Sequence, residues 1–210
     1  MPPKLKSVAL IGSYPPRHCG IATFTADLAA AILENKPKID CFIVALNDRA
    51  EGYEYPDAVR FQISQDNLSE YRLAANFLNL RDPDVVCLQH EYGIFGGQRG
   101  SFIIELVRNL KIPLVTTFHT VLKDPLAEEL KITTQLCELS DRVVVMSERG
   151  ADFLRDSYQV PASKIVLIHH GIPDVPFLEP DPCKKKIAAD DKIVILTFGL
   201  LSPGKGIEFM

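Results

Sequence analysis

Short apolar runs of strand length alternate with amphipathic segments of helix length along most of this chain, and this alternation constrains the fold more than any other feature. Ser7 to Ile11 is a continuous β run of the kind that is buried on both faces in a parallel sheet. After a loop, apolar residues recur at helical spacing from Ile21 to Ile32 and predict a helix that ends near Asn35. Such alternation with short connections predicts a doubly wound parallel α/β sheet with right-handed crossovers.

The alternation continues as far as residue 168. Each change from one hydrophobic period to the other marks the boundary of an element. Further strands are predicted at residues 41–46, 59–63, 85–88, 112–118, 142–146 and 164–168, and further helices around residues 71–78, 102–110 and 126–139 and after Ser147, which we expect to cap the last of them.

A proline-rich stretch at residues 173–182 then interrupts the pattern. Proline removes a backbone donor and fixes φ, so we expect neither a helix nor a central strand there. We predict an N-terminal Rossmann-like domain over residues 1–172 and an interdomain linker over 173–191. Residues 193–198 form a fresh apolar run before a glycine-rich turn, so 192–210 are expected to begin a second Rossmann-like domain that is cut off.

Composition excludes several classes of protein. The net charge is −4 and no basic stripe is present that could neutralise nucleic-acid phosphates, so no nucleic-acid partner is expected. The 5 cysteines are widely spaced and form no C-x-x-C pair, which favours reduced thiols in a cytoplasmic protein over a zinc site. No apolar run approaches the roughly 18 residues that span a membrane. We expect a cytoplasmic protein without a transmembrane segment, still able to contact a membrane peripherally.

Three familiar motifs are nearly matched. Gly12 and Gly20 are too far apart for the G-x-G-x-x-G fingerprint of dinucleotide binding. HEYGI begins like the zinc motif H-E-x-x-H, but Ile94 stands where the second histidine is needed. GLLSPGKG resembles a P-loop, but Gly206 replaces the hydroxyl that would bind magnesium, so a P-loop nucleotide hydrolase is only a minor alternative.

Loops rich in glycine and polar residues follow several predicted strands, at the edge of the sheet where ligands generally bind. The first loop ends in Gly20 at a helix start, where backbone N–H groups favour an anion such as a diphosphate. A glycine needed only for the turn is an equal alternative. The loop at residues 89–97 combines a histidine, a carboxylate and glycines, and a further loop places His119 at a strand end, where a structural histidine is the alternative.

Six pieces of the chain, in order, resemble the family 4 retaining glycosyltransferases of the GT-B fold, of the mannosyl- and glucosyltransferase type. They are SYPPRHCGIATFTADLA, QHEYGIFGG, TTFHT, VVVMSERG, IHHGIPD and FGLLSPGKGIE. The resemblance implies two Rossmann-like domains that face a cleft, with the acceptor held mainly by the N-terminal domain and the donor mainly by the C-terminal one. It implies transfer of a hexose from a nucleotide diphosphate sugar to a sugar or lipid-linked acceptor, with retention and without a metal or other cofactor.

The same resemblance implies roles for individual residues. Gly20 would lie near the donor diphosphate, and Lys205 would pair with the diphosphate as it leaves. His119 would lie near the transferred sugar, with Glu91 as a second catalytic residue. We expect the acceptor to be bound by His90, Tyr92 and Thr120.

The sequence departs from the family pattern in the turn of the second domain. An arginine usually follows the first glycine there, but this chain has Leu200, and a lysine alone lacks the bidentate fork of an arginine. Arg17, in the first loop, is a candidate substitute at the donor. The acidic pair that grips the donor in this family would lie beyond Met210, so the 210 residues alone are expected to be inactive. A non-catalytic sugar-binding or scaffolding module is the alternative function.

Overall fold

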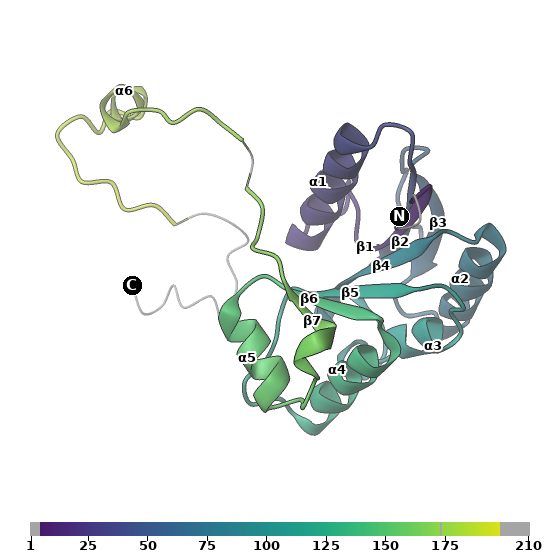
Figure 1. Cartoon of the computed structure of the whole chain (residues 1–210). Helices are drawn as coiled ribbons and strands as arrows, with labels where there is room; N and C mark the ends of the chain where they lie inside the picture. The colour runs from purple at the N-terminus through teal and green to yellow at the C-terminus, as the bar shows by residue number, and fades with distance from the viewer. Residues whose placement is uncertain (1–4, 173, 198–210) are drawn as a thin grey trace. The chain divides into compact units, whose positions relative to one another are not determined.

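The computed structural model describes residues 5–172 and 174–197. The chain divides into two compact units, Met1–His170 and Gly171–Met210, each described by itself. The first unit is built on a seven-stranded sheet with strand order β3-β2-β1-β4-β5-β6-β7, and every pair in it is parallel (Figure 1). The doubly wound parallel sheet predicted from the sequence is confirmed. Its strands are β1 (Ser7–Gly12), β2 (Asp40–Asn47), β3 (Val59–Ser64), β4 (Val85–His90), β5 (Leu114–Phe118), β6 (Arg142–Val145) and β7 (Ile165–Leu167).

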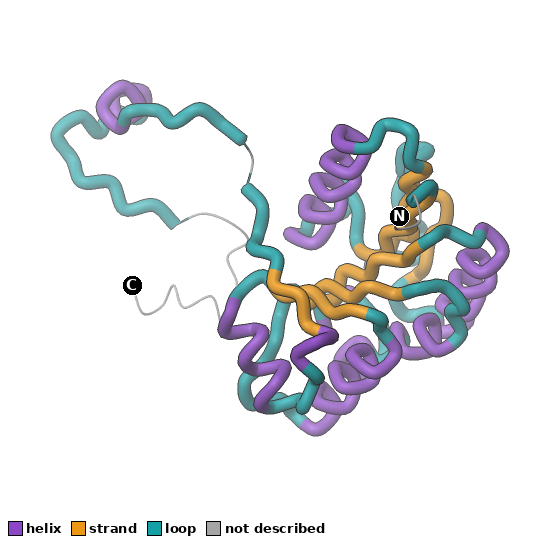
Figure 2. Tube along the Cα trace, viewed as in Figure 1, coloured by secondary structure: helices purple, strands orange, loops and turns teal. Residues whose placement is uncertain are grey.

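Helices lie on both faces of this sheet (Figure 2). One face packs against α1, and the other packs against α2 to α5 (Figure 1). Alternate residues of a strand point to opposite faces, so Leu10 belongs to the core under α1 while Ile11 belongs to the core on the other side. The helices are α1 (Gly20–Asn35), α2 (Leu68–Arg81), α3 (Ile103–Arg108), α4 (Ala127–Leu139) and α5 (Glu148–Asp156), with short 3-10 turns η1 (Tyr92–Ile94), η2 (Gln98–Gly100) and η3 (Ala162–Lys164).

The helix starts follow local capping chemistry. Ser147 Oγ accepts a hydrogen bond from the Gly150 backbone N–H at 3.1 Å, which confirms the predicted cap of α5. Cys19 caps α1 in the same way through its sulfur, which accepts from the Ala22 N–H at 3.3 Å. Both caps lie in loops that follow a strand, the Cys19 cap after β1 and the Ser147 cap after β6, so the first turn of each helix begins on the side of the carboxyl edge of the sheet.

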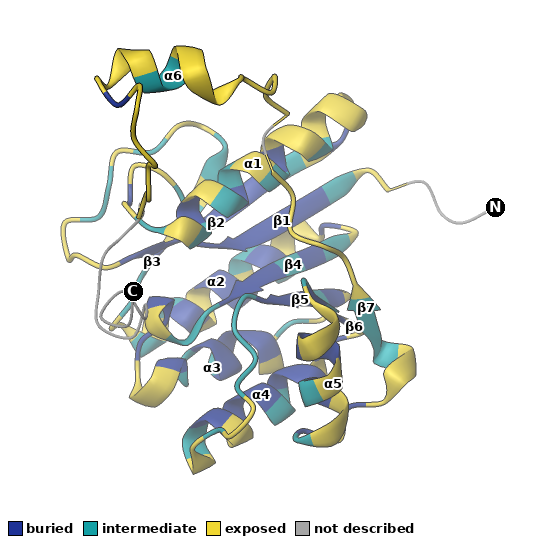
Figure 3. Cartoon of the chain, turned by 90° about the vertical axis from the view of Figure 1, so that its left-hand side faces the viewer, coloured by how far each residue is buried: buried dark blue, intermediate teal, exposed yellow. Residues whose placement is uncertain are grey.

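The central strands are almost entirely buried, as Figure 3 shows for β1, β2 and β4. The strand order reverses between β1 and β4, since β2 and β3 add on one side of β1 and β4 to β7 on the other. In open α/β sheets, a crevice at the carboxyl ends of the strands forms at such a switch point. The loops that follow β1 and β4 flank this switch point, and the loop after β5 lies next to the one after β4.

The second unit differs from what the sequence predicts. A helix, α6 (Pro180–Lys186), forms in the proline-rich stretch, although we expected none. Pro180 and Pro182 lie in its first turn, where the backbone N–H groups have no partner within the helix, so their missing donors cost nothing. Residues 193–197 form no strand, and the remainder of that predicted strand lies outside the described residues. Lys205 and Leu200 lie outside them as well.

Candidate functional site

The segments that follow β4 and β5 remain hydrogen-bonded to each other beyond the strands. The His119 backbone N–H donates to the His90 carbonyl oxygen at 3.0 Å. The side chain of His119 lies with Nε2 3.0 Å from Gln89 Oε1, and Thr120 Oγ1 donates to Glu91 Oε2 at 2.6 Å. The structure thus brings together three residues that the sequence selects for the site, Glu91, His119 and Thr120.

Successive residues of this pair of segments point to opposite faces of the sheet. Gln89 and His119 lie on the face that carries α1, where the ring of Phe24 meets the His119 imidazole edge to face at 4.6 Å between centroids. A Cβ on Gly12, at the end of β1, would come within 3.1 Å of Gln89 Cβ, so β1 and Gln89 are in close contact. His119 therefore stands between the first turns of α1 and the ends of β4 and β5.

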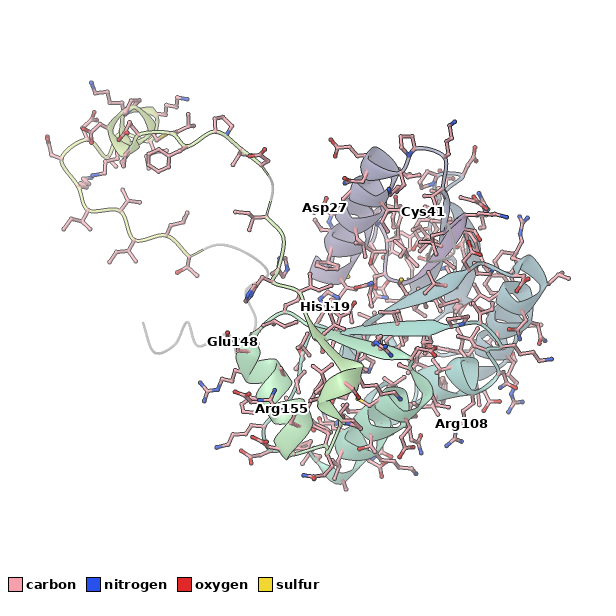
Figure 4. All side chains as sticks on the ribbon, in the orientation of Figure 1. Asp27, Cys41, Arg108, His119, Glu148 and Arg155 are labelled. Carbon is pink, nitrogen blue, oxygen red and sulfur yellow. The ribbon has the colours of Figure 1, made fainter. Side chains whose placement is uncertain are left out.

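A cavity of about 210 Å³ adjoins His119. His119 lies at the carboxyl end of β5, and Glu148 marks the start of α5 nearby (Figure 4). Burial, and to a smaller extent the neighbouring His170, lower the pKa of His119 to about 4, so the imidazole is neutral at pH 7. A neutral imidazole can donate one hydrogen bond and accept another. The cavity is lined by Phe118, His119, Val121, Val145, Met146, Ser147, Arg149, Gly150 and Phe153.

His90 points to the opposite face and is completely buried. Its ring stacks on Phe95 and meets Tyr92 and Phe118 edge to face, with centroids 5.0 to 5.8 Å away. Burial lowers its pKa to about 3, and neither ring nitrogen has a hydrogen-bond partner among the described residues. In this conformation the ring has no surface at which it could touch an acceptor.

Tyr92 also turns away from the carboxyl edge. Its hydroxyl lies 2.6 Å from Thr133 Oγ1 on α4, and burial raises the pKa of the phenol. Glu91 Oε1 accepts from the Tyr92 backbone N–H at 3.0 Å, so the carboxylate holds both its own loop and Thr120. Of the three residues expected to bind the acceptor, Thr120 is the one whose side chain bonds to Glu91.

The glycines of these loops fall into two groups. A Cβ on Gly20 or Gly93 would meet no atom within 4 Å, so the surrounding chain does not require glycine at either position. A Cβ on Gly96 would overlap the Gln65 carbonyl oxygen, and Gly97 has a φ of +78° beside Phe102. Gly96 and Gly97 are needed by the fold, whereas Gly20 leaves the start of α1 open to a ligand.

Arg17 is 8% exposed and anchors the first loop to the ends of β2 and β3. Its guanidinium donates to the Leu46 carbonyl at 3.1 Å and to Gln65 Oε1 at 3.4 Å, and its Nε lies 3.4 Å from Asp48 Oδ2. These contacts occupy several of the five N–H groups of the side chain. The structure therefore places the proposed substitute for a donor-binding arginine inside a protein contact network.

Sequence reasoning gave no role to two residues that shape the site. Gln89 is buried and contacts His119, and Phe24 forms one wall of its environment. A polar residue at the end of an otherwise apolar strand is a signal that could have drawn attention to Gln89. No comparable signal marks Phe24, because its spacing is that of any core residue of α1.

The described parts of the chain contain no group of three or more His, Cys, Asp or Glu side chains that could hold a metal ion. Their five cysteines are all free. No helix within residues 5–172 and 174–197 is both long and apolar enough to cross a membrane.

The fold is a Rossmann-like α/β fold that solved glycosyltransferases share. A lipopolysaccharide outer core galactosyltransferase, WaaB, in its apo form matches 79% of this chain and 46% of its own, with a TM-score of 0.56 and 12% identity. A glycosyltransferase from Rickettsia africae matches 87% of this chain and 50% of its own, with a TM-score of 0.57 and 17% identity. At these identities the likeness shows the fold alone, and the chain spans about half the length of the proteins it matches.

A third solved protein of similar fold is the UDP-GlcNAc 2-epimerase from Neisseria meningitidis bound to UDP-GlcNAc, which matches 78% of this chain and 45% of its own (TM-score 0.50, 15% identity). No curated protein matches the sequence. The sequence model of Glycosyltransferase Family 4 matches residues 19–174, which is more than half of the chain. The chain belongs to this family, and the predicted family 4 assignment is confirmed.

Proposed function

We propose that this chain is the acceptor-side domain of a glycosyltransferase that moves a hexose from a nucleotide diphosphate sugar to a sugar or lipid-linked acceptor. In this proposal the transfer retains the configuration of the sugar, and the enzyme is of the mannosyl- or glucosyltransferase type. The observation that carries the proposal is the position of His119, in the wall of a cavity at the carboxyl edge and inside the segment that matches the family. A nucleotide sugar donor is supported by the UDP-GlcNAc 2-epimerase of similar fold, whose structure holds UDP-GlcNAc.

The chemistry of the proposal follows from charge. A nucleotide diphosphate leaves with negative charge building on its oxygens, and fixed donors aimed at those oxygens lower the barrier. The first turn of α1 offers backbone N–H groups at Gly20, and Lys205 supplies a point charge in this proposal. Because these groups carry out the stabilisation, transfer is expected to need no metal. His119 contacts the transferred sugar, Glu91 is the second catalytic residue, and Thr120 contributes to the acceptor site.

The proposal is tested by a calorimetric screen of nucleotide diphosphate sugars on the longest natural form of the protein, followed by a transfer assay with the sugar that binds best. We expect binding of one such sugar and transfer that survives EDTA. Binding without transfer to any sugar or lipid-linked acceptor would favour the non-catalytic sugar-binding or scaffolding module. Thermal stabilisation by ATP with magnesium, and by no nucleotide sugar, would favour the P-loop hydrolase.

The His119→Ala variant tests the central assignment. Removing the imidazole takes a contact from the transferred sugar, so kcat should fall by about 100-fold, in the range seen when one polar catalytic group is lost. The melting temperature should change far less, because the ring makes one side-chain hydrogen bond. His169→Ala, at an exposed position, is the matched control and should keep full transfer. Unaltered transfer by His119→Ala would remove this residue from the mechanism.

A further inference from the structure

The orientation of the His119 ring is set by a residue that the proposed function leaves without a role. Gln89 is the fifth residue of β4 and is completely buried. Its Oε1 lies 3.0 Å from His119 Nε2. With the amide oriented as in this structure, its oxygen accepts from Nε2–H of the neutral imidazole, which leaves the lone pair on Nδ1. The Nε2 of Gln89 has no hydrogen-bond partner among the described residues.

We propose that Gln89 is a positioning residue that holds His119 in the Nε2–H tautomer, so that the imidazole meets the sugar as a hydrogen-bond acceptor through Nδ1. The inference rests on the proposed function for the identity of the ligand. Its chemical consequence is that His119 recognises a sugar hydroxyl, which donates, and not a phosphate oxygen, which accepts. A donor sugar that lacks this hydroxyl loses that contact.

The surroundings of the pair restrict the positions of the Gln89 and His119 side chains. Its Cβ packs close to Gly12 of β1, and the backbone of the partner is fixed because the His119 N–H donates to the His90 carbonyl. The edge of the Phe24 ring system restricts the imidazole from the α1 side, with the planes 87° apart. Backbone, amide and aromatic contacts together define one ring orientation, as a binding group requires.

Burial, and to a smaller extent the neighbouring His170, lower the pKa of His119 to about 4 and so disfavour a positive charge on the ring. His119 therefore stays neutral at physiological pH, and the tautomer alone determines whether it donates or accepts.

The test reads the tautomer directly, by two-bond ¹H–¹⁵N correlation spectra of the histidine rings in the whole 210-residue chain without substrate. We expect a protonated Nε2 and a lone pair on Nδ1 in the wild type. Gln89→Leu should populate both tautomers, because the acceptor is lost. Gln89→Glu should restore Nε2–H and raise the His119 pKa by about 1 to 3 units, because a carboxylate favours the charged imidazole. Gln135→Leu, on α4, is the matched control and should leave the His119 signals unchanged.

An Nδ1–H tautomer in the wild type would overturn the proposal, since it would mean that the Gln89 amide donates to Nε2. An unchanged tautomer in a folded Gln89→Leu would overturn it as well. If Gln89→Leu fails to fold, the wild-type spectrum and the rescue by Gln89→Glu still decide. No substrate is needed, so a failure here is distinguishable from an absence of glycosyl transfer.

Discussion

Arg17 has contacts that stabilise the fold and is also a candidate for binding the donor. Its contacts tie the loop after β1 to Leu46, Gln65 and Asp48. Arg17→Met should lower the free energy of unfolding by about 1–3 kcal/mol, because the buried Leu46 carbonyl and the partly buried Gln65 amide oxygen lose a charged donor. Urea denaturation measures this. Arg155→Met is the control, since Arg155 pairs with Asp152 at the surface and should contribute less than about 1 kcal/mol.

If Arg17 binds the donor as well, nucleotide sugar affinity should fall in Arg17→Met by more than the loss of stability explains. An unchanged dissociation constant in a variant that is still folded would restrict Arg17 to its structural role.

For Gly20, in contrast to Arg17, we expect a substitution to affect donor binding and not to lower stability. A Cβ there meets nothing within 4 Å, so Gly20→Ala should leave stability unchanged or raise it by about 0.4–1 kcal/mol through the unfolded state. Donor binding should weaken at least tenfold if a diphosphate approaches this backbone, because the new methyl group stands in its path. Calorimetry with the nucleotide sugar compares the two effects. Equal affinity in Gly20→Ala would leave the glycine as a turn residue only.

Sequence reasoning reached Glu91, His119 and Thr120 because they follow predicted strands, and these three are brought together. It could not predict that His119 lies beside a cavity whereas His90 is completely buried. Both lie at strand ends, but the register of β4 turns His90 into an aromatic cluster and leaves His119 beside a cavity. That difference depends on which face each residue takes and on what covers that face, and neither is visible in a local pattern.

The loop that connects β4 to α3 contains Gly93 and Gly96, for which we expect different effects of substitution by alanine. Gly96→Ala should destabilise the protein severely, by more than about 3 kcal/mol, because its Cβ would overlap the Gln65 carbonyl oxygen and the backbone would have to move. Gly93→Ala, three residues earlier, should change stability by less than about 0.5 kcal/mol, since the space there is open. Thermal unfolding compares the two. Similar melting temperatures would contradict the packing of Gln65 on this loop.

The boundary of a helix could be predicted where one residue type signals it, and could not where the effect of a residue depends on its place within the helix. Ser147 was identifiable as a cap from its place before a helix, and the structure confirms it. Pro180 and Pro182 would break a helix in its interior, and for this reason the sequence predicts no helix there. At the first turn of α6 the same residues are tolerated, so their position within the helix determined the outcome.

At the scale of the whole molecule, the two histidines with lowered pKa make stability depend on pH. In the unfolded chain each takes up a proton near pH 6.5, whereas in the folded protein His119 does so at about 4 and His90 at about 3. The stability is therefore level above about pH 7 and falls as the pH drops from about 6.5 toward 4. Each histidine contributes a slope of up to about 1.4 kcal/mol per pH unit in this window.

His90→Phe isolates one of these contributions. Phenylalanine places an apolar ring in the aromatic cluster and cannot take up a proton in the unfolded state. Relative to wild type, the variant should gain about 2 kcal/mol between pH 7 and pH 5, measured as the change in urea unfolding free energy. Parallel pH profiles for the two proteins would show that His90 takes up its proton equally in both states.

The fold as a whole was the most predictable level, because strand–helix alternation with short connections admits few topologies. The parallel direction of the strands follows from that rule, and the burial of β1 on both faces agrees with its place inside the sheet. The end of the chain was less predictable. An apolar run such as residues 193–197 takes strand form only when neighbouring strands supply backbone partners, so composition alone does not determine it.

The order of the strands also bears on how the chain assembles as it is synthesised. Of the seven strands of this sheet, β1 is made before the others and lies inside the finished sheet, with β2 and β3 added outward on one side and then β4, β5, β6 and β7 outward on the other. Each of the later six strands thus leaves the ribosome when its partner already exists, and none has to insert between two strands that are already paired. Productive pairing can therefore keep pace with translation, which shortens the time for which an open sheet edge is exposed to other nascent chains.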